Sequence, residues 1–274
     1  MAKQGRAQPA ILPTQSGSPN LPLARGGYFR ISAEPWHILL FLTPFIIFHE
    51  LASAGIIGGG MSETLEAQDM LVRFFDLFGV IGLHLPAVAL VVTLLMQHVL
   101  SKAKWGIQPG VLLAMLAESA FLTGPLIVIA IVLSTLVPAA MLPQVAPVIG
   151  DSAAGLSTFE GFYLAFGAGL YEEMLFRLVL ITVLHFFVTD VLGFKHKTGL
   201  IVAVALSSIA FAVHHDSVMI QGQGVQWQRA IFYTLAGVYF GVLFLARGFG
   251  IAVGAHLMYD LLVLVVMPGI QGDS

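Results

Sequence analysis

The sequence predicts an all-α, polytopic transmembrane helical bundle, and its composition and long apolar segments support this prediction. Of its 274 residues, 58% are hydrophobic and only 10% are charged, whereas soluble domains carry roughly a quarter charged residues. Lipid is therefore the expected solvent. An apolar run of about 18 or more residues can cross the membrane as a helix. Seven such segments occur, at residues 37–57, 77–98, 110–137, 159–188, 199–214, 230–246 and 251–266.

The predicted spans differ in length, so both seven and eight spans are consistent with the sequence. Segment 199–214 is short, whereas segments 110–137 and 159–188 are long enough to tilt, break or split. Gly237 with Gly241, and Gly250 with Gly254, have the small-x-x-x-small spacing that lets helix backbones approach closely. We therefore expect the last two helices to lie against neighbours.

The chain is expected to divide into a tail and one membrane domain. Residues 1–35 are rich in Gly, Pro, Gln and Ser and lack the apolar core and cleavage site of a secretory signal. They are expected to form a flexible cytoplasmic tail. Residues 36–274 are expected to form one transmembrane domain, whose motif-bearing core lies at 159–266.

The distribution of basic residues orients the predicted spans, because short cytoplasmic loops collect Lys and Arg. With the N-terminus in the cytoplasm, the opposite side receives only Arg73 and Arg229. The cytoplasmic side receives the tail together with Lys102, Lys104, Lys195, Lys197 and Arg247. We expect a multi-pass protein of a bacterial or archaeal cytoplasmic membrane. The net charge of -3 and the scattered basic residues argue against nucleic acid as a partner.

Ionisable side chains stand out in three of the later segments. At bilayer depth each costs on the order of 2.5–3.5 kcal/mol on insertion scales, so such groups are usually paired and functional. Because cysteine is absent, any metal would bind His and carboxylate side chains. The candidate site residues are Glu172, Glu173, Arg177, His215, His256 and Asp260.

Helical spacing separates the expected roles of the residues that share a helix. Glu173 and Arg177 are four residues apart, so they share a face and can form the pair that a buried Arg requires. Glu172 points about 100° away and has no partner in its own segment, which leaves it available as a general base. His256 and Asp260 are also four apart and point to one place.

These residues are compatible with two chemistries and with one purely structural role. In the first, Glu172 and His215 polarise a water that attacks a carbonyl, while His256 and Asp260 donate, orient or stabilise the oxyanion. In the second, zinc carries the attacking water and is held by His215, His256 and a carboxylate, with Glu172 and Asp260 as the candidates. In the third, the charges form an ion-pair network that only fixes helix packing. Spacing alone does not separate the three.

Three short motifs that follow one another along the chain resemble the signature of the CPBP family. This family comprises CAAX proteases and bacteriocin-processing enzymes of membranes and is also called the Abi family. Glu-Glu-x-x-x-Arg begins at Glu172, and Phe-x-x-x-His runs from Phe211 to His215. His-x-x-x-Asn/Asp runs from His256 to Asp260. The resemblance covers roughly the C-terminal half of the chain.

The resemblance implies an intramembrane (metallo)endopeptidase similar to type II CAAX prenyl endopeptidases. It assigns Glu172 and His215 as the water-activating pair and His256 and Asp260 as the supporting pair. The implied substrate is a peptide or membrane protein, either prenylated or a peptide precursor. Zn²⁺ stays open as a cofactor, because the role of a metal in the family is disputed. Asp260 stands where many relatives have Asn, and an ionised Asp cannot donate a hydrogen bond.

Two other functional classes are weighed beside the protease. A non-enzymatic membrane scaffold or bacteriocin-immunity protein would use the same cavity and tolerate loss of Glu172. A proton-coupled transporter would also bury ionisable residues, but the sequence shows no internal repeat. The motif Phe-x-x-x-His selects His215 rather than its neighbour His214. The remaining ionisable residues of the spans are interpreted as structural or cavity-lining; these are His49, Glu50, His84 and Glu118.

Overall fold

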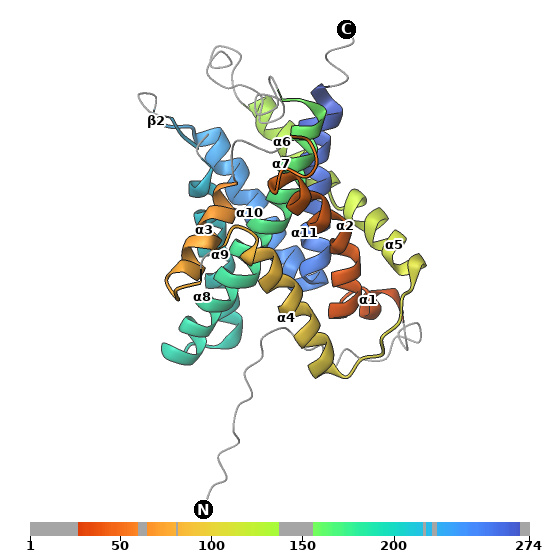
Figure 1. Ribbon diagram of the computed structural model, residues 1–274. Coiled ribbons are helices and arrows are strands. Elements are labelled where there is room, and N and C mark those ends of the chain that lie inside the picture. Colours follow the sequence, from red (N-terminus) through yellow and green to blue (C-terminus); the bar gives the residue numbers. More distant parts are fainter. Residues whose placement is uncertain are drawn as a thin grey trace, which may run out of the picture.

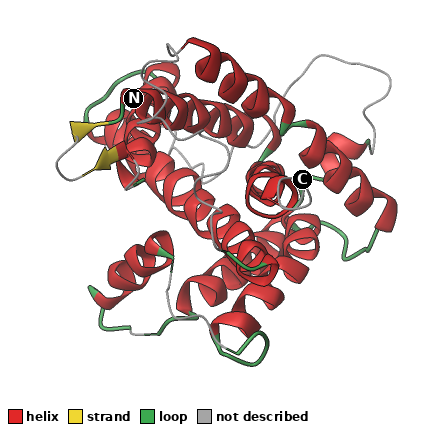
Figure 2. Cartoon of the chain, turned by 90° about the horizontal axis from the view of Figure 1, so that it is seen from above, coloured by secondary structure: helices red, strands yellow, loops and turns green. Residues whose placement is uncertain are grey.

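A computed structural model describes residues 27–59, 65–80, 82–136, 156–215, 218–220 and 224–268. Most of the tail predicted at 1–35 lies outside these ranges. The described end of that tail includes a short helix, α1 (Tyr28–Ile31). Figure 2 shows that the described chain consists of helices and their connecting loops, with one small pair of strands at its edge.

The described chain forms the predicted helical bundle of about seven spans. Six helical stretches are long and apolar enough to cross a membrane, and α4 (Leu85–Ser101) is a shorter apolar helix. The long stretches are α2 (Pro35–Ser53), α5 (Pro109–Phe121) with α6 (Gly124–Leu136), the stretch Thr158–Val191, α9 (His196–His214), α10 (Trp227–Arg247), and α11 (Phe249–Leu261) with η6 (Leu262–Val266).

The stretch Thr158–Val191 is built from α7 (Thr158–Glu173), the π-helical η3 (Met174–Ile181), α8 (Thr182–Phe186) and the π-helical η4 (Phe187–Val191). Its start is defined by a capping box, in which Ser157 Oγ accepts from the Glu160 backbone N–H at 3.2 Å and Glu160 Oε2 accepts from the Ser157 N–H at 2.7 Å. Proline in the first turn starts α2, α4 and α5, where its missing N–H costs nothing.

The connection between the first two spans differs from the prediction. The second span was expected to begin at Leu77, but α4 begins at Leu85. The preceding chain forms a separate helix, α3 (Glu66–Asp76), whose buried face includes Gln68 and Leu71 and whose first turn is acidic. Hydropathy alone extended the predicted span over residues 77–84, because the sequence between α3 and α4 is itself largely apolar. The strands β1 (Met219–Ile220) and β2 (Gly224–Val225) pair antiparallel before α10 and were also not predicted.

Helix α11 lies at the centre of the bundle, between α10 and α2 in Figure 1, and most of its residues are buried. The predicted close approaches of the last two helices are present. A Cβ at Gly237 of α10 would lie 2.8 Å from Ser208 Cα of α9, and one at Gly254 of α11 would lie 2.9 Å from Ser119 Cβ of α5. These glycines let the helices pack closely enough for side chains of three spans to meet.

Candidate active site

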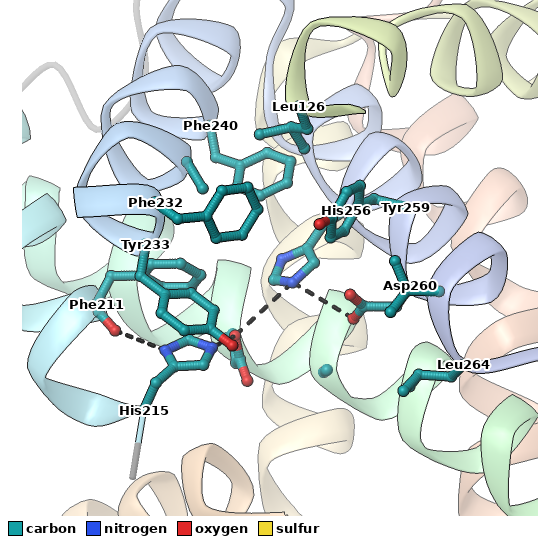
Figure 3. A pocket seen from close by; sticks show the side chains of 14 residues that line it. Leu126, Phe211, His215, Phe232, Tyr233, Phe240, His256, Tyr259, Asp260 and Leu264 are labelled. Carbon is teal, nitrogen blue, oxygen red and sulfur yellow. Dashed lines mark hydrogen bonds and ion pairs between the residues drawn. The ribbon is translucent and has the colours of Figure 1, made fainter. Parts of the chain in front are cut away.

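Polar side chains from three spans meet in one cavity of about 160 Å³ (Figure 3). Glu172 comes from α7, His215 follows α9, and His256 and Asp260 come from α11. The rest of the lining is largely apolar and aromatic, with residues Leu126, Ala168, Phe211, Phe232, Tyr233, Ala236, Phe240, Tyr259, Val263 and Leu264. The fold therefore brings together four of the six predicted site residues in a mostly apolar enclosure.

The carboxylate of Glu172 faces two imidazole rings. Its Oε2 lies 3.9 Å from His215 Nε2 and 3.8 Å from His256 Nε2. Among the described residues this oxygen accepts no direct hydrogen bond. The distances suit a single water molecule that bridges the groups rather than direct bonds.

His215 is oriented by the end of α9 and by Tyr233. The helix ends at His214, and His215 has an extended backbone (φ -81°, ψ 112°). Its Nδ1 donates to the Phe211 carbonyl at 2.8 Å, and its ring stacks on Tyr233 with centroids 3.7 Å apart. With the proton on Nδ1, Nε2 of the neutral ring is an acceptor that faces Glu172.

His256 is held between two carboxylates and one aromatic ring. Its Nδ1 donates to Glu173 Oε1 at 2.8 Å, and its Nε2 lies 3.5 Å from Asp260 Oδ2. The ring also stacks on Phe240, with centroids 4.6 Å apart. These contacts fix the ring and direct Nε2 into the cavity.

Glu173 and Arg177 support this arrangement from behind the cavity wall. Arg177 Nη1 lies 3.2 Å from Glu173 Oε1, and both side chains are fully buried, in agreement with the pairing predicted from their spacing. Arg177 Nη2 donates to the Gly237 carbonyl at 3.3 Å, and its guanidinium lies 4.4 Å from the centre of the Phe211 ring. Arg177, Glu173 and His256 thus form a chain of contacts that ends at the cavity.

The preference for His215 over its neighbour agrees with the structure. His214 Nδ1 lies 3.8 Å from Glu66 Oε2 of α3, and its ring packs beside Phe176. Only His215 is among the cavity-lining residues in the described part of the chain. Adjacent residues at the end of α9 therefore contact different elements.

The other ionisable residues singled out in the sequence have structural contacts. Glu118 accepts two bonds from Arg247, at 2.6 and 2.8 Å, and a further bond from Tyr28. Glu50 contacts Tyr171 and His84. His49 is fully buried, and its Nδ1 lies 3.2 Å from the Tyr163 carbonyl. Each set of contacts links helices that are distant in the sequence.

Four aromatic residues of the cavity, Phe232, Tyr233, Phe240 and Tyr259, were not singled out by the sequence. Tyr233 and Phe240 belong to α10, whose apolar middle offers no ionisable residue as a signal. Tyr259 belongs to α11 and directly precedes Asp260. Its polar hydroxyl beside a predicted site residue was the available signal.

The geometry does not add support to the zinc interpretation. Within the described ranges, no group of three or more His, Asp or Glu side chains is arranged to hold a metal ion. The groups that face one another do so at 3.5–3.9 Å. The chemistry proposed below is that of the metal-free alternative.

Comparisons with known proteins agree with a membrane protease. A family model described as type II CAAX prenyl endopeptidase Rce1-like matches residues 154–262, which include all six predicted site residues. The sporulation-killing factor biosynthesis protein SkfC of Bacillus subtilis (strain 168) is 27% identical over 128 residues, which are 46% of this chain and 23% of that protein.

The chain thus spans less than a quarter of the length of this curated relative. No solved structure shows significant similarity to the chain. The family match over residues 154–262 and the relative both support a similarity of this part of the chain to membrane proteases of the CPBP family.

Proposed function

We propose that this protein is an intramembrane endopeptidase that hydrolyses a peptide bond with a water activated by Glu172 and His215. One observation carries the proposal: Glu172 Oε2 lies 3.9 Å from His215 Nε2 and 3.8 Å from His256 Nε2 inside a mostly apolar cavity. When one water donates hydrogen bonds to both a carboxylate and an imidazole nitrogen, its oxygen attacks from a defined direction.

The chemistry follows from the donors and acceptors of the two residues. Glu172 takes one proton from the water while His215 Nε2 accepts a hydrogen bond from the other O–H. The water oxygen bonds to the carbonyl carbon, and the carbonyl electron pair moves to its oxygen. Glu172 then returns its proton to the amide nitrogen as the C–N bond breaks. The products are a carboxylic acid and an amine.

His256 and Asp260 act as the supporting pair in this proposal. Because Glu173 holds His256 Nδ1 at 2.8 Å, only Nε2 of that ring faces the cavity. When it carries a proton, Nε2 donates toward the developing oxyanion. Asp260, 3.5 Å from that nitrogen, keeps the ring in position.

The cavity wall supports a substrate with apolar side chains near the cleaved bond. Phe211, Phe232 and Leu264 lie on the wall close to the polar groups (Figure 3). The name of the matching family refers to prenylated CAAX proteins, and the name of the relative refers to a killing factor. We therefore propose either a prenylated C-terminus or a peptide precursor as substrate.

The test compares Glu172→Gln with the wild type in detergent or liposomes. The matched control is Asp190→Asn, the same change on an η4 residue of the same span but outside the cavity. The substrates are quenched-fluorescence peptides that include farnesylated CAAX sequences. We expect Glu172→Gln to lower the cleavage rate by about 10²–10⁴-fold at an unchanged melting temperature, while the control cleaves normally.

Other results would replace the proposal. Full cleavage by Glu172→Gln contradicts the role of this residue. Cleavage that is lost on chelation and restored by added Zn²⁺ favours the metal-bound water instead. Peptide binding without cleavage by the wild type favours a non-enzymatic scaffold.

A further inference from the structure

Tyr259 has a buried hydroxyl group without a hydrogen bond to any described residue. The residue is 8% exposed and lines the same cavity as Glu172, His256 and Asp260. Figure 3 shows it beside His256, across the cavity from His215. A buried O–H without a partner is destabilising by roughly 1–3 kcal/mol. Such a group is therefore a candidate to bond a ligand that enters the cavity.

The proposed hydrolysis creates a need for such a donor. The tetrahedral intermediate carries a negative oxygen that hydrogen-bond donors must stabilise. His215 cannot supply one, because its Nδ1 donates to Phe211 and its Nε2 acts as an acceptor. The Nε2 of His256 faces the cavity and can serve this purpose. An ionised Asp260 accepts hydrogen bonds but donates none.

The two tyrosines of the cavity lie at different sides of it. Tyr233 stacks flat on His215, with ring centroids 3.7 Å apart, and is thereby part of the water-activating side. Tyr259 belongs to α11, as do His256 and Asp260, and its ring lies 6.0 Å from that of Phe232. Its hydroxyl is thus on the side where the oxyanion would form.

We propose that Tyr259 is a catalytic residue whose hydroxyl donates a hydrogen bond to the oxyanion, together with His256 Nε2. The inference rests on the proposed endopeptidase function. As the water oxygen bonds to the carbonyl carbon, the carbonyl electron pair moves to the oxygen that faces Tyr259. The phenol keeps its proton throughout, and the electron pair re-forms the C=O bond when the C–N bond breaks. Tyr259 thereby supplies the hydrogen-bond donor that an Asn side chain would offer at the position of Asp260.

The experiment compares Tyr259→Phe with Tyr239→Phe in the full-length protein. The Tyr239 hydroxyl donates to the Leu122 carbonyl at 2.6 Å and lies outside the cavity, so its loss removes a tyrosine O–H without touching the site. For each variant we would measure kcat and KM for peptide cleavage and the melting temperature. We would also measure Kd for a phosphinate peptide, which mimics the tetrahedral intermediate, and for the same peptide with an uncleavable reduced bond.

We expect Tyr259→Phe to lower kcat by about 10²–10³-fold, the effect of losing one oxyanion donor, with KM unchanged and the melting temperature unchanged or raised. The phosphinate should bind more weakly by a similar factor, whereas the reduced-bond peptide should bind as before. Tyr239→Phe should retain the wild-type kcat.

Two results would overturn the role of Tyr259 alone. One is a wild-type kcat for Tyr259→Phe while Glu172→Gln is inactive, and the other is a change confined to KM and reduced-bond peptide binding. Absence of any Glu172-dependent cleavage would overturn the proposed function, and the role of Tyr259 with it. The activity of Glu172→Gln therefore distinguishes a wrong role for Tyr259 from a wrong proposed function.

Discussion

At the residue scale, the buried charges behind the cavity are the most sensitive positions. Arg177 and Glu173 are fully buried, and Glu173 also holds His256. Removing one partner of a buried pair leaves the other charge without compensation, which costs about 3–5 kcal/mol in measured cases. An exposed pair such as Arg30 with Glu34, at 3.9 Å and with Arg30 67% exposed, contributes roughly 0–1 kcal/mol.

We predict that Arg177→Met lowers the free energy of unfolding by about 3 kcal/mol or more, whereas Arg30→Met changes it little. Unfolding of the purified protein in mixed micelles, followed by tryptophan fluorescence, measures both. The double variant Glu173→Gln/Arg177→Met should recover part of the stability but not the cleavage activity, because His256 still lacks its anchor. Equal free energies of unfolding for Arg177→Met and Arg30→Met would contradict the prediction.

At the element scale, the contact between α7 and α11 sets the geometry of the site. A Cβ at Gly169 of α7 would lie 2.9 Å from Leu257 Cβ and 3.1 Å from Leu257 Cα and N. Those atoms belong to α11 next to His256, and backbone atoms cannot move without shifting the helix. The helices must therefore separate to admit even a methyl group.

We predict that Gly169→Ala lowers both the unfolding midpoint and the cleavage rate, because separation lengthens the 2.8 Å bond between Glu173 and His256. The matched control is Gly110→Ala in α5, where no described atom lies within 4 Å of the added Cβ. There Ala should leave stability unchanged or raise it by up to about 1 kcal/mol. An unchanged unfolding midpoint and cleavage rate for Gly169→Ala would show that the contact between α7 and α11 is looser than the structure indicates.

At the scale of the whole molecule, the bundle allows the predicted orientation to be tested. In Figure 1 the C-terminal end of α4 and the connection from η4 to α9 lie toward the same end of the bundle as α1. The exposed residues Lys104 and Lys197 follow α4 and begin α9, respectively. The β1–β2 hairpin lies toward the other end. The distribution of basic residues predicts that the end with α1 is the cytoplasmic one.

Because the natural chain has no cysteine, single cysteines report this orientation without background. We predict that Val225→Cys in β2 reacts with a membrane-impermeant maleimide in intact cells. Lys104→Cys and Lys197→Cys should react only after the membrane is permeabilised. The reverse pattern would show an inverted protein, with the hairpin in the cytoplasm.

The sequence by itself determined the spans and the local pairs, because both depend on short-range properties. Hydrophobicity along a segment decides whether it can cross lipid, and a four-residue helical spacing brings Glu173 to Arg177 and His256 to Asp260. The three motifs also indicated the resemblance to a family of membrane proteases.

Only the tertiary structure decided which residues of different helices meet. The separate helix α3, the 3.8 Å approach of Glu172 to His256, and the places of Tyr233 and Tyr259 in the cavity depend on which helix faces pack together. Those faces are selected by contacts between distant segments, such as Gly169 against Leu257 and Gly237 against Ser208. Neither hydropathy nor motif spacing records these contacts, because each property is local to one helix.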